Sequence, residues 1–332
     1  MTRQVRSALF ARCALLLALS LFLRVLPALE LTAVRLPDFG HLTRLLSAAD
    51  EPAPPSSAEE EQPLREIPEL RFRDVPPETD SEPEPALPMP TFTAEDTARL
   101  NIRGNCTLSY DAAALLTAAL PAAPDADGPQ ILIVHTHSTE AYEPEPGWEY
   151  EETEPYRTLD PEHSVIRLGC EIAAVLEQHG IPVLHDKTIN DYPSYAGSYD
   201  RMAAIIEDHL VQYPSIRMVL DVHRDAFENP DGSMGGTAEN GTAKIMLVTG
   251  TDEGGLYHPH WQQNLSCAMK LDLLLQEMPG LSRGISLVTQ RYNQHLTPFS
   301  LLAEFGAAGD TLQEAMAAAN AFARSLARLL SG

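Results

Sequence analysis

Short apolar runs alternate with longer amphipathic segments from about residue 100 to the end of the chain. The runs are rich in Ile, Leu and Val and predict strands at 131–134, 181–184, 216–222, 243–248, 285–289 and 300–304. The longer segments have apolar side chains at helical spacing and predict helices at 164–179, 199–211, 261–277 and 311–330. This order predicts an α/β domain, residues 100–332, with a mixed, mostly parallel sheet and helices on both faces.

The N-terminus has a different pattern. Three arginines precede an apolar run from 14 to 23, and apolar residues continue after Arg24. A basic flank before such a run is typical of a membrane-inserted segment whose basic side stays in the cytoplasm. Because no clear cleavage site follows, we expect residues 1–34 to be an uncleaved single-pass anchor in the cell membrane, with the rest of the chain outside the cytoplasm.

Acidic residues and prolines are concentrated between the anchor and the domain. Residues 50 to 100 include fourteen Asp and Glu and four Arg, and eleven of the 27 prolines lie between Pro52 and Pro90. Such a segment buries too little apolar surface to fold, so residues 35–99 are predicted to be an acidic, Pro-rich linker. The formal charge of the chain, −24, argues against nucleic acid as a partner, because a phosphate backbone needs a basic footprint.

Polar side chains follow three of the predicted strands at the point where each strand ends. His137 comes just after the first strand, His223 ends the third, and Glu304 ends the last. Strand ends are where α/β proteins build their sites. Zinc in hydrolases is held by His and carboxylate ligands and activates water beside a carboxylate base. We therefore expect His137 and His223 to be zinc ligands and Glu304 to be the general base and acid.

Each of these residues alone also fits a structural role, such as a polar strand end or a core histidine, so their joint placement is what favours the metal site. A third ligand is still needed, and two carboxylates are candidates. Glu140 follows His137 by three residues and reaches the site if the chain turns there. Asp160 lies just before the first long helix. The sequence leaves Glu140 and Asp160 open as alternatives.

Several motifs together resemble the stage II sporulation protein P family. They are the segment 191–199 and the motifs ILIVHTHSTEAY, DVHRDA, RYNQ and LLAEFGAAGDT. The resemblance covers about residue 100 to the end, and the family is similar to zinc-dependent N-acetylmuramoyl-L-alanine amidases. It implies peptidoglycan degradation during engulfment of the forespore, with hydrolysis of the amide between N-acetylmuramic acid and L-alanine and peptide-cleaving endopeptidase activity.

The resemblance also implies roles for individual residues. The two zinc histidines of the amidases correspond to His137 and His223, and their catalytic glutamate corresponds to Glu304. The amidases' third ligand precedes the first long helix, and Asp160 is the nearest equivalent by position. Glu140 is then either the ligand or a residue that orients a histidine, and His135 is likewise either a ligand or an orienting residue.

A peptidoglycan substrate would have stem-peptide carboxylates, for which Arg224, Arg283 and Arg291 are candidate partners. Asn293, in the RYNQ motif, is a candidate for lining the substrate groove, with the capping of a turn as the alternative. For Arg224, a salt bridge to Asp225 or another nearby acid is an alternative. By resemblance, the protein partners are a transglycosylase like stage II sporulation protein D and a membrane protein that recruits both. Two other functions stay open: a zinc endopeptidase that acts only on stem peptides, and a non-catalytic scaffold that binds the cell wall.

Overall fold

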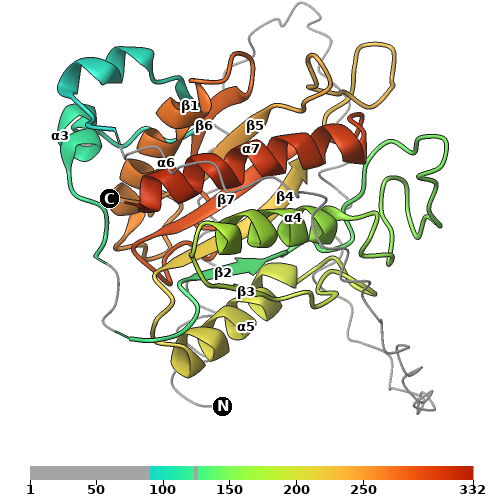
Figure 1. Cartoon of the computed structure of the whole chain (residues 1–332), viewed down its shortest axis with the longest axis horizontal. Helices are drawn as coiled ribbons and strands as arrows, with labels where there is room; N and C mark the ends of the chain where they lie inside the picture. Colours follow the sequence, from blue (N-terminus) through green and yellow to red (C-terminus); the bar gives the residue numbers. More distant parts are fainter. Residues whose placement is uncertain (1–89, 123–125, 332) are drawn as a thin grey trace, which may run out of the picture. The chain divides into compact units, whose positions relative to one another are not determined.

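Seven strands form one sheet at the centre of the protein (Figure 1). This computed structural model describes residues 90–122 and 126–331. Along the chain the strands are β1 (Ile102–Gly104), β2 (Ile131–Val134), β3 (Val183–His185), β4 (Met218–Asp225), β5 (Ile245–Gly250), β6 (Ser282–Val288) and β7 (Ser300–Ala307). Their order across the sheet is β1-β6-β5-β7-β4-β2-β3.

All neighbouring strands are parallel except β5 and β7. The sheet therefore consists of two parallel blocks that run in opposite directions. The predicted mixed, mostly parallel sheet is confirmed. In the block formed by β7, β4, β2 and β3, the carboxyl ends of all four strands lie at one edge.

Helices cover both faces of the sheet, as predicted. They are η1 (Ala94–Arg99, a 3-10 helix), α3 (Ala112–Thr117), α4 (Val165–Gln178), α5 (Ser198–Gln212), α6 (Trp261–Leu275) and α7 (Leu312–Leu330). Alternation along β2 separates the two faces: Ile131 and Ile133 belong to the core cluster beneath α4, α6 and α7. Leu132 and Val134 pack on the other face with apolar residues of α5. Figure 1 shows α4 and α7 lying side by side over the sheet.

Capping residues set the helix boundaries that the sequence predicts. The Ser164 side chain accepts a hydrogen bond from Ile166 N at the start of α4. Thr311 and Glu314 form a reciprocal capping box at the start of α7. The elements β1, α3 and η1 were not predicted, and η1 lies within the range expected to be linker.

Within residues 90–122 and 126–331, no helix is both long and apolar enough to cross a membrane. The predicted anchor, residues 1–34, and most of the predicted linker lie outside the described residues.

Candidate active site

Three strand ends bring the predicted site residues together at one edge of the sheet. His223 on β4 pairs in register with Glu304 on β7, and Asp221 pairs with Val134 at the end of β2. His223, Asp221 and Glu304 alternate onto the same face as Val134, the face that carries α5. The loop that follows β2 then adds His137 to this face, with its imidazole 5.3 Å from that of His223 between ring centroids.

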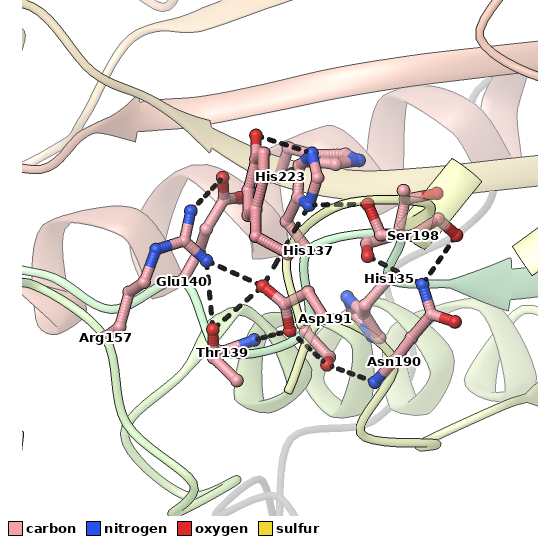
Figure 2. Close-up of polar contacts among 12 residues, drawn as sticks. His135, His137, Thr139, Glu140, Arg157, Asn190, Asp191, Ser198 and His223 are labelled. Carbon is pink, nitrogen blue, oxygen red and sulfur yellow. Dashed lines mark hydrogen bonds and ion pairs between the residues drawn. The ribbon is translucent and has the colours of Figure 1, made fainter. Parts of the chain in front are cut away.

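Two buried aspartates hold the loop after β2 in place, and one of them, Asp191, is labelled in Figure 2. Asp221 accepts hydrogen bonds from Thr136 N (2.9 Å) and Thr136 Oγ1 (2.6 Å). Asp191, from the loop before α5, accepts them from Ser138 Oγ (2.9 Å), Thr139 N (3.0 Å) and Thr139 Oγ1 (2.8 Å). These bonds satisfy the donors of a buried turn, so the loop has one fixed conformation.

His223 lies between two carboxylates. Its Nδ1 is 3.3 Å from Glu140 Oε2, and its Nε2 is 2.9 Å from Asp221 Oδ1. Burial alone would lower the pKa of His223, but Asp221 and Glu140 outweigh burial and hold the pKa well above its usual value. Burial would raise the pKa of Glu140, but His223 outweighs it and holds that pKa below its usual value. In this arrangement the histidine is a cation between two anions.

The two ring nitrogens of His137 have different surroundings: Nε2 faces the site, and Nδ1 contacts the residues that orient the ring. Its Nδ1 lies 3.4 Å from Ser198 Oγ and 3.9 Å from Asp191 Oδ2. Its Nε2 lies 3.0 Å from the hydroxyl of Tyr195. The turn that Glu140 requires is present, because Glu140 N donates to His137 O at 3.2 Å. Glu140 thereby comes to lie beside His223.

Glu304 is buried and incompletely satisfied. Its Oε2 has no hydrogen-bond partner. Burial, with a further contribution from Glu140 and Asp225, raises the pKa of Glu304 to about 8. The Nε2 of His223 also lacks a hydrogen bond of acceptable angle, although it is close to Asp221. The unpartnered buried oxygen of Glu304 indicates a site that a further polar or ionic group would complete.

The spacing of these residues fits zinc in part. Two ligand atoms of a tetrahedral zinc ion are roughly 3.3–3.4 Å apart, and His223 Nδ1 and Glu140 Oε2 are separated by 3.3 Å. A ligating histidine usually presents its other nitrogen to a carboxylate, as His223 does to Asp221. In the part of the chain that the structure describes, however, no three His, Cys, Asp or Glu side chains are arranged to hold an ion as they stand. One donor pair, His223 and Glu140, fits zinc in kind and spacing, and among the described residues no third donor joins that pair as the side chains stand.

The other candidate ligands lie elsewhere. His135 is on the opposite face of the sheet, where its Nδ1 donates to Val222 O (3.1 Å) and its Nε2 contacts His185 Nε2 (2.8 Å). Asp160 is half-exposed and pairs with Nδ1 of His163 at 2.8 Å. The structure therefore brings Glu140, and neither His135 nor Asp160, into contact with His223.

Three of the predicted substrate-binding residues, Arg224, Arg283 and Asn293, have local partners. Arg224 is buried, and its guanidinium donates to the backbone carbonyls of Ala141 (2.6 Å) and Tyr156 (2.8 Å). Arg283 pairs with Asp225 at 2.9 Å. Asn293 donates to the carbonyl of Tyr199 at 2.7 Å. Their roles in substrate binding stay predictions.

Arg157 and Tyr195 belong to the site but were assigned no role from the sequence. Arg157 Nη1 contacts Asp191 Oδ2 at 2.6 Å, and Nη2 is 4.0 Å from Glu140 Oε1. Tyr195 stacks on His137. Both come from loops, where no periodicity marks a residue's position. The one signal in the sequence was the resemblance of segment 191–199 to the family motif.

Comparison with known proteins gives a family match. The profile of stage II sporulation protein P (SpoIIP) matches residues 57–327. "Stage II sporulation protein P" of Bacillus subtilis is 30% identical over 207 residues, which cover 58% of this chain and 49% of the relative. The chain thus spans about half the length of the curated relative that it matches.

Solved structures of N-acetylmuramoyl-L-alanine amidases also align with the chain at low scores. One from Nostoc punctiforme is 14% identical, covers 62% of this chain and 97% of its own, and has a TM-score of 0.36. One from Mycobacterium smegmatis is 12% identical, covers 61% and 97%, and has a TM-score of 0.38. One from Clostridium difficile is 12% identical, covers 62% and 96%, and has a TM-score of 0.37.

Proposed function

Because the chain belongs to the stage II sporulation protein P family, we propose that it is a zinc-dependent peptidoglycan hydrolase of sporulation. Its reaction is hydrolysis of the amide between N-acetylmuramic acid and L-alanine. The observation that supports this most directly is the buried Glu304 carboxyl, which has an unpartnered oxygen and is paired in register with His223. An unsatisfied carboxyl next to a histidine held by carboxylates is what metal-assisted amide hydrolysis requires.

In this proposal His137, His223 and Glu140 would hold zinc, and His223 would release its Nδ1 proton to solvent on binding. The ion would polarise the scissile carbonyl and lower the pKa of water. Asp221 orients the imidazole of His223, and Ser198 orients that of His137. We prefer Glu140 to Asp160 because Glu140 contacts His223 directly.

Glu304 is assigned the proton transfers. It removes a proton from the attacking water and delivers one to the departing amine, so that the amide C–N bond breaks and water is consumed. Without a metal its pKa of about 8 keeps the carboxyl largely protonated at neutral pH. A nearby divalent cation would favour the carboxylate, which is the form that a base needs.

The cellular arrangement is part of the same proposal. Residues 1–34 would anchor the protein in the cell membrane, and residues 35–99 would link the anchor to a catalytic domain outside the cytoplasm. A transglycosylase like stage II sporulation protein D would cut the glycan strand that this domain strips of peptides, and a membrane protein would recruit both.

Digestion of purified peptidoglycan by the full chain, with and without zinc, tests the proposal by mass spectrometry. An amidase releases free stem peptides, whereas an endopeptidase leaves sugar attached to shortened peptides. The Glu304→Gln variant should bind zinc with unchanged stoichiometry while its turnover falls about 100- to 10,000-fold, because the base is lost and the ligands stay.

Near-normal turnover of Glu304→Gln would show that Glu304 is not the base. Wall binding that needs no zinc and generates no new products, on intact or denuded glycan, would instead support a scaffold.

A further inference from the structure

The hydroxyl of Tyr195 lies next to the proposed zinc histidine. Tyr195 comes from the loop between β3 and α5, and its ring stacks on that of His137 with centroids 4.3 Å apart and planes 12° from parallel. The hydroxyl oxygen is 3.0 Å from Nε2 of His137. The contact therefore joins a hydroxyl to the nitrogen that is available for a ligand, while Nδ1 faces Ser198.

The parallel rings determine what this contact can be. The lone pair of an imidazole nitrogen lies in the plane of the ring, whereas an atom belonging to a stacked ring lies above that plane. The Tyr195 hydroxyl therefore approaches Nε2 of His137 from the side of the stacked ring, at hydrogen-bond distance. If Nε2 held zinc, it would not accept the hydroxyl proton, which would then be available to another acceptor.

A charged residue also holds the Tyr195 ring. The guanidinium carbon of Arg157 lies 4.9 Å from the ring centroid, in a cation–π contact. Arg157 is itself fixed by Asp191 Oδ2 (2.6 Å) and Thr139 Oγ1 (3.0 Å). Tyr195 is nevertheless 55% exposed. The Tyr195 side chain is therefore exposed to solvent but fixed by His137 and Arg157, an arrangement that suits contact with a bound substrate.

A second tyrosine, Tyr199, also contacts His137 and is backed by Tyr292. Tyr199 meets the His137 ring edge-on, with centroids 5.4 Å apart, and packs against Tyr292 at 5.3 Å. Tyr195 differs because its hydroxyl, rather than its ring edge, is directed to the ligand nitrogen. The tyrosines around His137 thus offer one donor beside the place where the scissile amide would bind.

We propose that the Tyr195 hydroxyl donates a hydrogen bond to the carbonyl oxygen of the scissile amide as negative charge develops on it. A fixed donor aimed at such an oxygen stabilises the transition state more than the ground state. No proton is transferred by Tyr195 in this step, and the acid–base work stays with Glu304. The inference rests on the proposed amidase activity and adds a catalytic residue to it.

The test compares Tyr195→Phe with Tyr192→Phe in the full chain. Tyr192 lies on the same loop, is 50% exposed and serves as the matched control. Four quantities are measured for each: zinc affinity by competition with a chromophoric chelator, kcat and KM on peptidoglycan, and affinity for a phosphinate analogue of the amide. The tetrahedral phosphinate carries its charge on the oxygens that replace the carbonyl oxygen.

Tyr195→Phe should leave zinc affinity and KM unchanged while kcat falls about 100-fold. Affinity for the phosphinate should fall by a similar factor, and Tyr192→Phe should match the wild type throughout. Unchanged kcat and phosphinate affinity in Tyr195→Phe would overturn the inference, as would a loss of zinc affinity, which would mean that the hydroxyl acts through His137. A wild-type chain that binds no zinc and cleaves nothing would overturn the amidase proposal itself, and this inference with it.

Discussion

The protein contains two histidine pairs of almost equal geometry on opposite faces of one sheet. The rings of His135 and His185 have centroids 5.1 Å apart, and those of His137 and His223 are 5.3 Å apart. One member of each pair comes from the same His-Thr-His motif. The two pairs nevertheless differ in their hydrogen-bond partners and in their charge.

The pair on the α4 face, His135 and His185, forms a hydrogen bond within the pair. His135 Nδ1 donates to Val222 O, so its Nε2 accepts the proton of His185 Nε2 at 2.8 Å. Burial lowers the pKa of His135 to about 4, and both rings are neutral. In the pair on the α5 face, Asp221 and Glu140 hold His223 as a cation, and Glu304 has an unpartnered oxygen. The spacing of two histidines therefore does not by itself favour a metal site. The proposed zinc site rests on the carboxylates beside His223 and on the unpartnered oxygen of Glu304.

The largest expected effect separates the two histidines of the motif. His137→Ala should lower zinc affinity by more than about 100-fold, because even residues that only orient ligands contribute 10- to 100-fold. His135→Ala should keep the zinc stoichiometry and lose stability by about 1–3 kcal/mol, because His185 loses its buried partner. Metal analysis after dialysis and thermal unfolding measure the two effects.

If His135→Ala does not fold, His185→Ala removes the other half of that pair and provides the same comparison. Zinc loss in His135→Ala or His185→Ala, with His137→Ala retaining the metal, would reverse the assignment of the two faces.

A smaller effect is expected from the carboxylate behind His223. Asp221→Asn keeps the size of the side chain but removes the charge that orients the imidazole, so zinc affinity should fall about 10- to 100-fold. Isothermal titration of the metal-free protein measures it. Asp191→Asn, which alters the loop clamp rather than His223, is the matched comparison and should have the weaker effect. Equal losses in both variants would mean that loop order, and not the charge beside His223, sets the affinity.

Sequence patterns predicted most of the fold because its elements are long or strongly periodic. The strand 131–134 and the helix beginning after Ser164 were predicted to within a residue or two. Among the small elements, β1, α3 and η1 were not predicted. The strand β1 has three residues, and its pairing with β6 depends on a partner about 180 residues away in sequence. A three-residue strand has too few positions to show alternation.

Only some of the site residues could be predicted from the sequence. His137, His223 and Glu304 could be found because each follows a recognisable strand, and parallel strands end at one edge. Choosing between Glu140 and Asp160 needed the turn after His137, which depends on hydrogen bonds that the turn donates to Asp191, a residue distant in sequence. Tyr195 reaches the site through a loop, and its stacking on His137 has no periodic signature in the sequence.

Packing against the α4 face gives a third prediction, which affects stability but not the site. A Cβ added at Gly169 on α4 would meet His185 Nε2 and lie 2.7 Å from His135 Nε2. Alanine favours a helix by about 1 kcal/mol over glycine, but overpacking of this kind costs about 1–3 kcal/mol. Gly169→Ala should therefore be neutral to about 2 kcal/mol less stable in denaturant unfolding, with zinc affinity unchanged.

A double-mutant cycle separates the clash from the helix effect. In a His185→Ala background the same Gly169→Ala change should lose part of its cost, because the contact with His185 is gone and the contact with His135 stays. An equal cost in both backgrounds would indicate that His185 does not contact Gly169 in solution.

The smallest expected effect is a pH dependence from the α4 face. His185 faces His135 and lies near Lys187, and burial, followed by His135, holds the pKa of His185 well below its usual 6.5. Below pH 6.5 the unfolded chain binds a proton at this residue that the folded chain does not bind, so this contribution to stability falls as pH falls. Between pH 7 and 5.5 the loss is about 1 kcal/mol for one such group. His185→Gln can still donate to His135 but cannot titrate, so its stability should decline less over this range. Parallel decline of variant and wild type in thermal unfolding would mean that His185 is protonated in the folded protein, and the two histidine pairs would then resemble each other in charge as well as in spacing.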